Sequence, residues 1–469
     1  KIQMKRNNAF MQAAPLMGAV KKGLQNMTGG VSMRCSRLLA LALAFCLLWG
    51  LAACAKTGEG PTEQPAVETE EHTLTIWAWD DTFNVKAANL AKAYYAKTDP
   101  GVQVDIVTMA QTDIITRLNT AFSSSNYEGL PNIVLIEDYR IQNFLKSYPG
   151  EFRDLSSIVD PNKFMEYKLR VMTEEGKIYG VPFDSGAAAL FYRTDYLQAA
   201  GYTQEDMQNL TWNEYIEIGK DVKAATGKYM LTLDPSDLGQ VRIMMQSAGA
   251  WYVKEDGESV DIAENEVLKA SLSTYQRMVD SGIALQVSGW DPFVKAFQEG
   301  EVASVPSGCW VMSNIVKAEE QSGKWAVAPI PRLDGIPESV NASSIGGGSW
   351  YVLSNVPGAD LAVDFLGKTF ASNEQLIDDL VKDISLVSTM KSAKDLKYRS
   401  EPSEFFGGQR IYEDLAAWTE QIPPVNYGLY TYTMEDIIAQ SLQSIMQGAD
   451  MDETLKNAQT QARASVLHS

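Results

Sequence analysis

Histidine is nearly absent from this chain, which has two histidines in 469 residues. His72 lies in an acidic stretch expected to be a linker, and His468 lies in the C-terminal tail. Catalytic serines and cysteines usually need a histidine base, and histidine is a frequent zinc ligand. The sequence therefore argues against Ser-His and Cys-His catalysis and against histidine-bound metals, and we expect neither a metal site nor a cofactor.

Cysteine is also scarce, with four residues in the chain. Cys35 and Cys46 lie in an apolar N-terminal segment, Cys54 ends that segment, and Cys309 is left alone. A single remaining cysteine cannot form an internal disulfide, even on the oxidising side of a membrane. We expect Cys309 to be a small, buried, apolar side chain.

Basic residues are few once the N-terminal segment is set apart. The first 53 residues hold seven of the 40 Lys and Arg and no Asp or Glu, which leaves 33 basic against 59 acidic residues and a net charge of −26. Such a surface repels phosphate backbones. Nucleic acid is therefore excluded as an expected partner.

Hydrophobic runs long enough to span a bilayer are lacking. Leu38 to Leu51 is uncharged for fourteen residues, whereas a spanning helix needs about 20. Such a run behind arginines is typical of a signal peptide, and its ending, Leu51-Ala52-Ala53-Cys54, resembles a bacterial lipobox. We predict a signal segment over 1–53, with Met33 as a candidate start, and a lipid on Cys54. A transmembrane anchor with an incidental cysteine is the alternative.

An acidic stretch follows the predicted lipidation site. Residues 54–72 contain five glutamates, two prolines and one valine, too few apolar side chains to form a core. They are expected to form a flexible tether with a reach of roughly 20 to 25 Å. From Thr73 the composition is that of a globular protein large enough for two cores.

Strand-like and helix-like segments then alternate. The strand-like ones are LTIWAWDD, VQVDIV and LPNIVLIED, and the helix-like ones between them are NVKAANLAKAYYAKTDPGV and DIITRLNTAFSS. The continuous apolar run in the third strand suits a sheet covered on both faces. The pattern predicts an α/β fold with a largely parallel sheet. Later segments are mainly helical, strand-like segments return at WAVAPIP and SWYVLS, and two helices broken at Gly448-Ala449 end the chain.

Several segments, in order, resemble the family 1 extracellular solute-binding proteins, the carbohydrate-binding lipoproteins of ABC importers that include maltose-binding protein. They are GKIYGVP, LFYRTDYLQAAGY, TWNEY, FQEGEVASVPSGCWVMSNI, AVAPIPRLDG and MQGADMDETLKNAQTQA. The resemblance covers nearly everything from Thr73 to the end. It implies an α/β, two-lobe periplasmic-binding-protein-like fold with the ligand cleft between the lobes and a hinge crossed by several strands.

Carried onto this chain, the resemblance places lobe 1 at 73–187 and 349–389 and lobe 2 at 190–346 and 390–469. The hinge crossings are expected near Gly186 to Ala189, near Gly347 to Trp350 and near Leu386 to Met390.

Physical chemistry gives a separate reason to expect a sugar. A pyranose has apolar faces and a rim of hydroxyls, so its site needs flat aromatics and carboxylates or amides. Such residues end the predicted strands of the first lobe, where loops of an open parallel sheet carry ligands. They are Trp79, Asp80 and Asp81, then Glu137, Asp138 and Tyr139. Helix capping before Asn84 is the alternative role of the two aspartates. Trp77 and Trp79 share a strand face, and we favour Trp79 for stacking.

Further candidates come from the family-like segments. They are Asp184 and Ser185 before the first crossing, Trp310 in SGCWVMSN, where the family often holds a cleft aromatic, and Gly348, Ser349 and Trp350 at the second crossing. Weaker candidates are Trp251 and Trp290 from the second lobe and Tyr430 from the C-terminal segment. A turn or cap is the other interpretation of Asp184 and Ser185, and a packing role that of Trp310. No Lys-Ser/Thr follows Gly346-Gly347-Gly348, so flexibility or close ligand approach suits these glycines better than phosphate binding. Trp212, Trp325 and Trp418 are expected to be packing residues.

The function that the resemblance implies is binding without chemistry. The lobes are expected to close on a carbohydrate, with an oligosaccharide favoured, and a membrane permease of an ABC transporter is expected to recognise the closed form. We expect a monomer, exported and anchored to the outer face of the cell membrane. The alternatives are a binder of a polyamine or metal chelate with the same fold, and a surface glycoside hydrolase using two of the same carboxylates.

Overall fold

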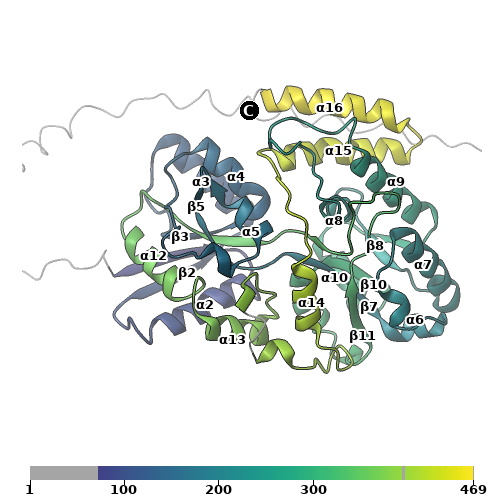
Figure 1. The fold of residues 1–469 in the computed structure, drawn as a ribbon, viewed down its shortest axis with the longest axis horizontal. Helices are drawn as coiled ribbons and strands as arrows, with labels where there is room; N and C mark the ends of the chain where they lie inside the picture. Colours follow the sequence, from purple (N-terminus) through teal and green to yellow (C-terminus); the bar gives the residue numbers. More distant parts are fainter. Residues whose placement is uncertain (1–71, 393–396, 468–469) are drawn as a thin grey trace, which may run out of the picture. The chain divides into compact units, whose positions relative to one another are not determined.

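The structure is a computed structural model that describes residues 72–392 and 397–467, all within one compact unit of the chain. The predicted signal segment, Cys54 and all of the tether except His72 lie outside the described residues. Two sheets organise this unit, and each is the centre of one lobe. The elements of lobe 1 lie on the left in Figure 1 and those of lobe 2 on the right.

Lobe 1 is built on a five-stranded sheet with the order β2-β1-β3-β13-β6. Its strands are β1 (Thr73–Ala78), β2 (Gln103–Thr108), β3 (Ile133–Glu137), β6 (Gly180–Pro182) and β13 (Gly348–Val352). β1 pairs in parallel with β2 and β3, as the alternating pattern predicted, whereas β13 runs antiparallel between β3 and β6. The first four residues of β3 are all buried, which confirms that both faces of this strand are covered.

Helices lie on both sides of this sheet in Figure 1. They are α2 (Asn84–Tyr95), α3 (Gln111–Ser124), α4 (Asp138–Ser147), α5 (Glu166–Val171), α12 (Ala359–Lys368) and α13 (Glu374–Ile384). A short hairpin, β4 (Thr173–Glu174) with β5 (Lys177–Ile178), precedes β6. In α2 the residues at helical spacing, Val85, Ala88, Ala91 and Tyr95, are buried, as their periodicity predicted.

Lobe 2 has an antiparallel sheet centred on β7. Its strands are β7 (Ala187–Arg193), β10 (Ser304–Gly308), β11 (Trp325–Pro329) and the short β12 (Ser343–Ser344), and a separate pair joins β8 (Leu231–Leu233) to β9 (Ala284–Gln286). All seven residues of β7 are buried. The helices around these strands are α6 (Thr194–Ala199), α7 (Trp212–Thr226), α8 (Gly239–Ser247), α9 (Glu266–Asp280), α10 (Trp290–Gln298), α11 (Met312–Ile315) and α14 (Ile411–Thr419).

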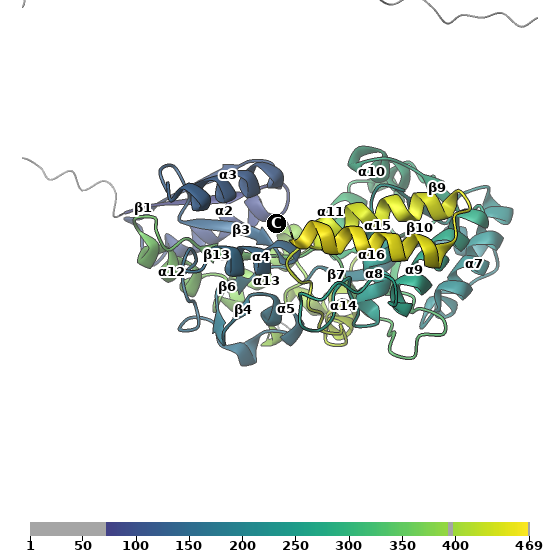
Figure 2. The same cartoon turned by 90° about the horizontal axis from the view of Figure 1, so that it is seen from above.

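The C-terminal segment forms two helices, as predicted. They are α15 (Thr431–Met446) and α16 (Met451–Leu467), which run side by side in Figures 1 and 2. The described helices include none with the length and hydropathy needed to cross a bilayer.

Three passages connect the lobes. The chain leaves the first sheet after Pro182 and enters the second at Ala187, then returns between Ser344 and Gly348. The third passage begins after Ile384, and its first residues lie beside the first passage, because Ser185 N donates to Val387 O at 3.0 Å. Each lobe is therefore made from separated parts of the sequence. The first two crossings begin a few residues before the predicted ones, since Ala187 to Ala189 and Gly348 to Trp350 are already strand residues.

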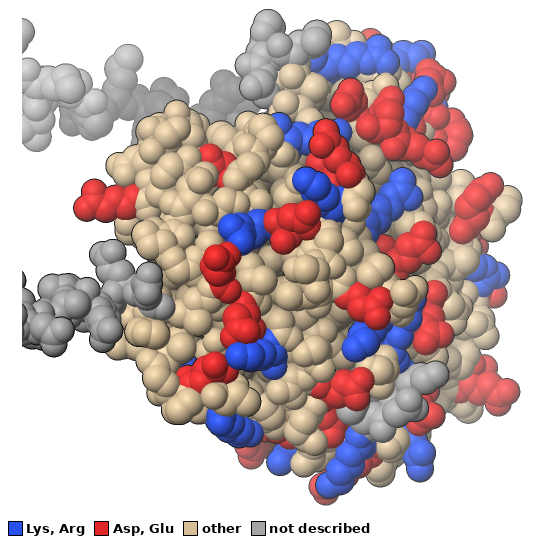
Figure 3. Space-filling view, turned by 60° about the vertical axis from the view of Figure 1, so that its left-hand side comes forward, with Lys and Arg blue, Asp and Glu red and all other residues tan. Residues whose placement is uncertain are grey.

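Charge is mixed over the face of the molecule seen in Figure 3. Acidic side chains there are interspersed with basic ones, so the negative excess of the chain is not gathered into one patch on that face.

Candidate functional site

A cleft of about 680 Å³ is lined by residues of both lobes and of the first two crossings. Lobe 1 contributes the ends of β1 and β3 and the start of α2, and lobe 2 contributes the segment after β8, the first turns of α8 and α10, and the end of β10. The volume lies within the range of small-molecule sites in proteins.

The end of β1 supplies an aromatic and a carboxylate. Trp77 is buried in the core of lobe 1, whereas Trp79, two residues nearer the strand end, is half-buried and lines the cleft. Asp80 Oδ1 accepts hydrogen bonds from Thr82 N at 2.7 Å and Phe83 N at 3.0 Å. Asp80 therefore holds the turn that leads into α2 and is not the helix cap, which is Phe83, and its side chain also lines the cleft.

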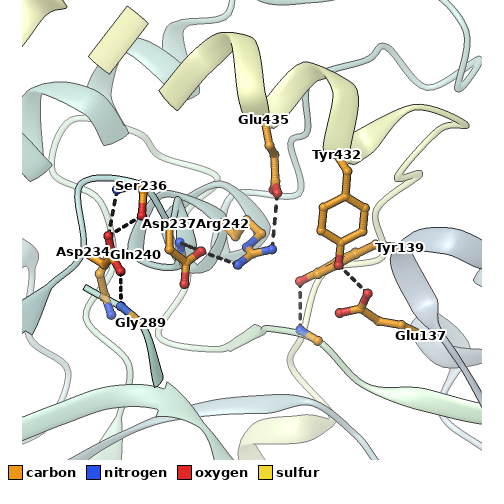
Figure 4. A network of polar contacts seen from close by, with 12 residues as sticks. Glu137, Tyr139, Asp234, Ser236, Asp237, Gln240, Arg242, Gly289, Tyr432 and Glu435 are labelled. Carbon is orange, nitrogen blue, oxygen red and sulfur yellow. Dashed lines mark hydrogen bonds and ion pairs between the residues drawn. The ribbon is translucent and has the colours of Figure 1, made fainter. Parts of the chain in front are cut away.

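The end of β3 reaches across to the C-terminal helices. Glu137 accepts a hydrogen bond from the hydroxyl of Tyr432 in α15 (Figure 4). Its carboxylate also lies 3.5 Å from Arg140 Nε. Arg140 also lies over the Tyr432 ring, 4.0 Å from its centroid. Tyr139 uses its hydroxyl to accept a hydrogen bond from Gly346 N at 3.0 Å. These contacts join lobe 1 to α15 and to the second crossing at the wall of the cleft.

Lobe 2 gives the cleft an aromatic wall. Trp290 begins α10, and its ring centroid lies 5.4 Å from that of Phe293 and 5.7 Å from that of Trp310. Trp310 Nε1 donates to Ile345 O at 3.2 Å, which fixes this indole against the second crossing. Trp290 is 48% exposed, and Val107 is the other large apolar residue exposed among those described. An exposed tryptophan backed by two aromatics in a cleft can stack on the apolar face of a ligand.

The polar groups of lobe 2 are held rigidly. Asp234 accepts from Ser236 N at 2.9 Å and from Gly289 N at 2.8 Å, so it ties the segment after β8 to the start of α10 (Figure 4). Burial raises the pKa of Asp234, but these hydrogen bonds outweigh it and leave the pKa below the usual value. Its carboxylate therefore stays ionised and fixes the residue that precedes Trp290.

Arg242 on α8 lies between two carboxylates. Its Nη2 is 2.7 Å from Asp237 Oδ1 and its Nη1 is 3.3 Å from Glu435 Oε2 on α15 (Figure 4). Burial raises the pKa of Glu435 to about 7, although Arg242 lowers it. Arg242 and Asp237 both line the cleft, so lobe 2 gives it a charged, hydrogen-bonded edge as well as the aromatic wall.

Gln240 offers an acceptor with no partner in the described part of the chain. Its Nε2 donates to Pro306 O at 2.8 Å, and its buried Oε1 is without a hydrogen bond. Buried acceptors are rarely left in this state without a ligand or water to satisfy them.

The structure brings part of the predicted site together. The predicted residues that line the cleft are Trp79, Asp80, Glu137, Tyr139, Asp184, Trp290, Trp310 and Gly348. Asp184 is buried in the first crossing, and its Oδ1 accepts from Gly348 N of the second crossing at 2.6 Å. Contact with a ligand stays a prediction for each of them.

Other predicted residues lie away from the cleft lining, and the structure gives each a different role. Ser349 and Trp350 are buried inside β13, where Trp350 stacks on Phe370 with 5.2 Å between ring centroids. Ser185 is buried, and its Oγ accepts from Ala187 N. These three residues stabilise lobe 1 and the first crossing, so we remove them from the proposed site.

The other predicted site residues that lie outside the cleft lining also have structural roles. Asp81 is exposed and accepts from the Thr108 hydroxyl at 2.8 Å, and Asp138 is buried in an ion pair with Lys168. Trp251 is buried, and its Nε1 donates to Thr431 Oγ1 at 3.0 Å. Tyr430 is half-buried and precedes α15. We remove these residues too, because the cleft lining does not include them.

Several residues of the cleft were not predicted. They are Phe83, Asn84, Gln111, Phe183, Thr232, Asp234, Asp237, Gln240, Arg242, Phe293 and Asn314. The sequence held one usable signal among them, the polar segment DPSDLGQVR that follows the buried β8, because polar residues after a strand end often face a site.

The described residues hold no cluster of His, Cys, Asp and Glu that could bind a metal ion. Cys309 is buried, as expected, and burial holds the pKa of its thiol well above the usual value. A thiol of this kind is a poor nucleophile.

Comparisons with known proteins agree with this geometry. The family model for bacterial extracellular solute-binding proteins matches residues 89–405. The chain is 42% identical over 393 residues to a lactose-binding protein of Rhizobium radiobacter, covering 84% of this chain and 93% of the relative. It is 25% identical over 375 residues to an arabinooligosaccharide-binding protein of Bacillus subtilis, covering 77% and 84%.

Solved structures share the fold. One is the galacto-N-biose-/lacto-N-biose I-binding protein of an ABC transporter from Bifidobacterium longum, with a TM-score of 0.69 at 23% identity, covering 84% of this chain and 97% of that one. The architecture is therefore the two-lobe α/β fold that the sequence predicted. The family match and the 42% identical relative establish more than the fold, and the chain belongs to the bacterial extracellular solute-binding proteins.

Proposed function

We propose that this protein captures a sugar in the cleft between its lobes and delivers it to the permease of an ABC importer. The observation that carries the proposal is one cleft, lined from both lobes, that combines the aromatics Trp79, Trp290 and Trp310 with a set of fixed carboxylates and amides. Sugars need both kinds of surface. Its relatives are binding proteins, and this protein is likewise a binding protein and not an enzyme.

The ligand we propose is a disaccharide or short oligosaccharide, with lactose as the first probe. This choice is supported by the 42% identical lactose-binding protein and by the oligosaccharide names of more distant relatives. Most carboxylates in the cleft are already engaged by backbone N–H groups or by Arg242, which leaves them less free to bind a polyamine or a chelated metal.

Closure of the lobes is the proposed mechanism. A ligand that touches Trp79 in lobe 1 and Trp290 in lobe 2 favours the conformation in which both contacts exist, in proportion to the contacts made only there. The passages at 183–186 and 345–347 connect the lobes and are the places where such a motion would bend.

We also propose that the protein works as a monomer held at the outer face of the cell membrane by a lipid on Cys54. The support is the lipobox-like sequence before Cys54 and the acidic stretch after it. Labelling of cells with a radioactive fatty acid tests this: the full chain should be labelled and partition into detergent, and Cys54→Ala should abolish both. Labelling that persists in the variant would contradict the proposal.

The ligand is tested with residues 67–469, which form a compact unit. A thermal-shift and calorimetry screen would use lactose, β-1,6-galactobiose, arabinooligosaccharides and maltodextrins, with spermidine and an iron chelate as non-sugar probes. A sugar that binds the folded state raises its melting temperature by mass action and should be recovered uncut. A shift with spermidine or the chelate alone, or cleavage of the sugar, would overturn the proposal.

A further inference from the structure

A buried lysine lies beneath the second crossing. Lys168 on α5 is fully buried, and its Nζ lies 2.8 Å from Asp138 Oδ1 and 2.7 Å from Oδ2. Asp138 is itself 3% exposed. Taking both charges out of water is costly, and the close contact with both oxygens offsets much of that cost. Because the desolvation cost cancels much of the stabilisation by such a pair, its position suggests a role other than stability.

A second buried carboxylate joins this pair. Asp184 in the first crossing is 7% exposed and interacts electrostatically with both Lys168 and Asp138. We call Lys168, Asp138 and Asp184 the crossing cluster. It contains two carboxylates and one ammonium, so it holds one excess negative charge when both carboxyls are ionised.

The crossing cluster holds the backbone of the second crossing. Gly348 N donates to Asp184 Oδ1 at 2.6 Å, and Asp138 N donates to Gly347 O at 3.1 Å. Gly347 lies so close that a Cβ on it would be 2.8 Å from Asp138 Oδ2 and 3.1 Å from Lys168 Nζ. Because Gly346, Gly347 and Gly348 line the cleft, the cluster sets the position of part of the ligand site.

The surroundings of the crossing cluster favour uptake of a proton. Burial raises the pKa of both carboxyls, and Lys168 lowers it. Repulsion by Asp184 raises the pKa of Asp138 further, whereas hydrogen bonds from backbone N–H groups lower that of Asp184, which still stays above its usual value. The other titratable groups that interact with these carboxylates supply no positive charge: Glu137, Tyr167, Cys309, Tyr351 and Tyr427. One proton shared by Asp138 and Asp184 would make the cluster neutral.

We propose that the crossing cluster positions the Gly346–Gly348 crossing for ligand binding and that its uptake of one proton loosens this crossing, so that the affinity for the ligand falls as the medium becomes acidic. The reason is that a hydrogen bond to an ionised acceptor is roughly twice as strong as one to a neutral acceptor. Protonation therefore weakens the hold of Asp184 on Gly348 or of Asp138 on Lys168. For its ligand, this inference rests on the proposed function.

Calorimetry with lactose tests the linkage on residues 67–469. Titrations between about pH 5 and pH 8, in paired buffers of different protonation enthalpy, give both the affinity and the number of protons exchanged. We expect an affinity several-fold lower at the acidic end and a net release of protons on binding there. Asp184→Asn keeps an oxygen that can accept from Gly348 N but removes the excess charge, so its affinity should depend far less on pH.

Asp105→Asn serves as the matched control, because Asp105 is exposed on β2, far along the sheet from β13, and its variant should keep the wild-type pH profile. A wild-type affinity that is constant over this range would overturn the inference. So would an Asp184→Asn variant with the wild-type pH dependence.

A second measurement needs no sugar. In protein labelled with ¹⁵N-glycine, the amide signals of Gly347 and Gly348 should shift with pH in one step, and Asp184→Asn should remove that step. Amides that do not titrate between about pH 5 and pH 8 would overturn the inference whatever the ligand. Amides that titrate in a protein that binds no sugar would instead contradict the proposed function and leave the crossing cluster supported.

Discussion

The ring of Tyr139 stacks on the indole of Trp251, with 5.3 Å between ring centroids and 28° between ring planes. Tyr139 belongs to α4 of lobe 1, and Trp251 follows α8 in lobe 2, so the stack is an apolar contact between the lobes. The ring of Tyr427 packs edge-on against both, with its centroid 4.6 Å from that of Tyr139 and 4.7 Å from that of Trp251. Tyr139 lines the cleft while Trp251 supports it from behind.

Trp251→Ala should therefore reduce both stability and affinity. We expect the free energy of unfolding to fall by about 3–5 kcal/mol, as for other buried tryptophans, and the affinity of the folded protein to fall several-fold because Tyr139 loses its support. Urea unfolding and calorimetry measure the two effects. Trp212→Ala is the matched control, since Trp212 is fully buried in α7 and away from the cleft. It should lose stability alone, and equal losses of affinity in the two variants would contradict this role of Trp251.

Trp290→Ala should weaken ligand binding with little loss of stability. The side chain is half exposed and stacks on aromatics that remain in place, so its removal leaves no buried cavity. An aromatic contact contributes about 0.5–1.5 kcal/mol beyond its buried area, which corresponds to a loss of at least several-fold in affinity. Val107→Ala, the other large exposed apolar side chain among those described, should leave the dissociation constant unchanged. An unchanged affinity in Trp290→Ala would place the ligand elsewhere in the cleft.

The free energy of unfolding should reach its maximum in mildly acidic solution. Glu435, with its pKa raised by burial to about 7, contributes stability that is fully present below its unfolded pKa and is lost as pH rises through about 7. The pKa of Asp256 is shifted in the opposite direction, because hydrogen bonds from Ser259 lower it to about 2. The stability that Asp256 contributes is therefore lost as the pH falls toward that value. Urea unfolding should therefore show rising stability from about pH 8 to pH 5 and falling stability below about pH 4.

Glu435→Gln isolates the contribution of that one carboxyl. The amide cannot ionise, so the variant should gain less stability than the wild type on acidification from about pH 8 to pH 5. Identical slopes in the two proteins would contradict the raised pKa of Glu435.

Gly347→Ala should be much more damaging than Gly448→Ala. Both glycines have positive φ, +95° and +96°, so alanine is strained at either position by about 1–3 kcal/mol. At Gly448 a Cβ meets nothing within 4 Å, whereas at Gly347 it would press on Asp138 and Lys168. The difference in free energy of unfolding between the two variants, measured in urea, reports this contact. Equal losses of unfolding free energy in the two variants would show that Asp138 and Lys168 move aside with no energetic penalty.

The sequence predicted the parts of the site that follow directly from strand ends. Trp79 and Glu137 end the parallel strands β1 and β3, and the rule that such ends face ligands needs no knowledge of the rest of the fold. Trp77 and Trp79 lie on the same face of the strand, but Trp77 is buried in the core, whereas Trp79, two residues further along, lines the cleft. Helical periodicity likewise predicted α2, and the break at Gly448-Ala449 predicted the final helix pair.

Lobe 2 was harder to predict because its cleft residues come from distant segments. Asp234 accepts a hydrogen bond from Gly289 N, 55 residues later in the chain, and Gly289 directly precedes Trp290. No local sequence pattern encodes that contact. Trp350 failed as a site prediction for a related reason. It lies next to the glycine crossing, but its side chain packs against Phe183 and Phe370 and is buried in the core of lobe 1.

The position of β13 also governs when lobe 1 can fold. This strand lies between β3 and β6 in the sheet, yet it follows β3 by about 210 residues, and α12 and α13 come later still. A ribosome must therefore synthesise most of the chain before the first sheet can be completed, and closing so long a loop slows folding. An exported protein benefits from this delay, because a chain that has not yet folded can still pass through a narrow secretion channel.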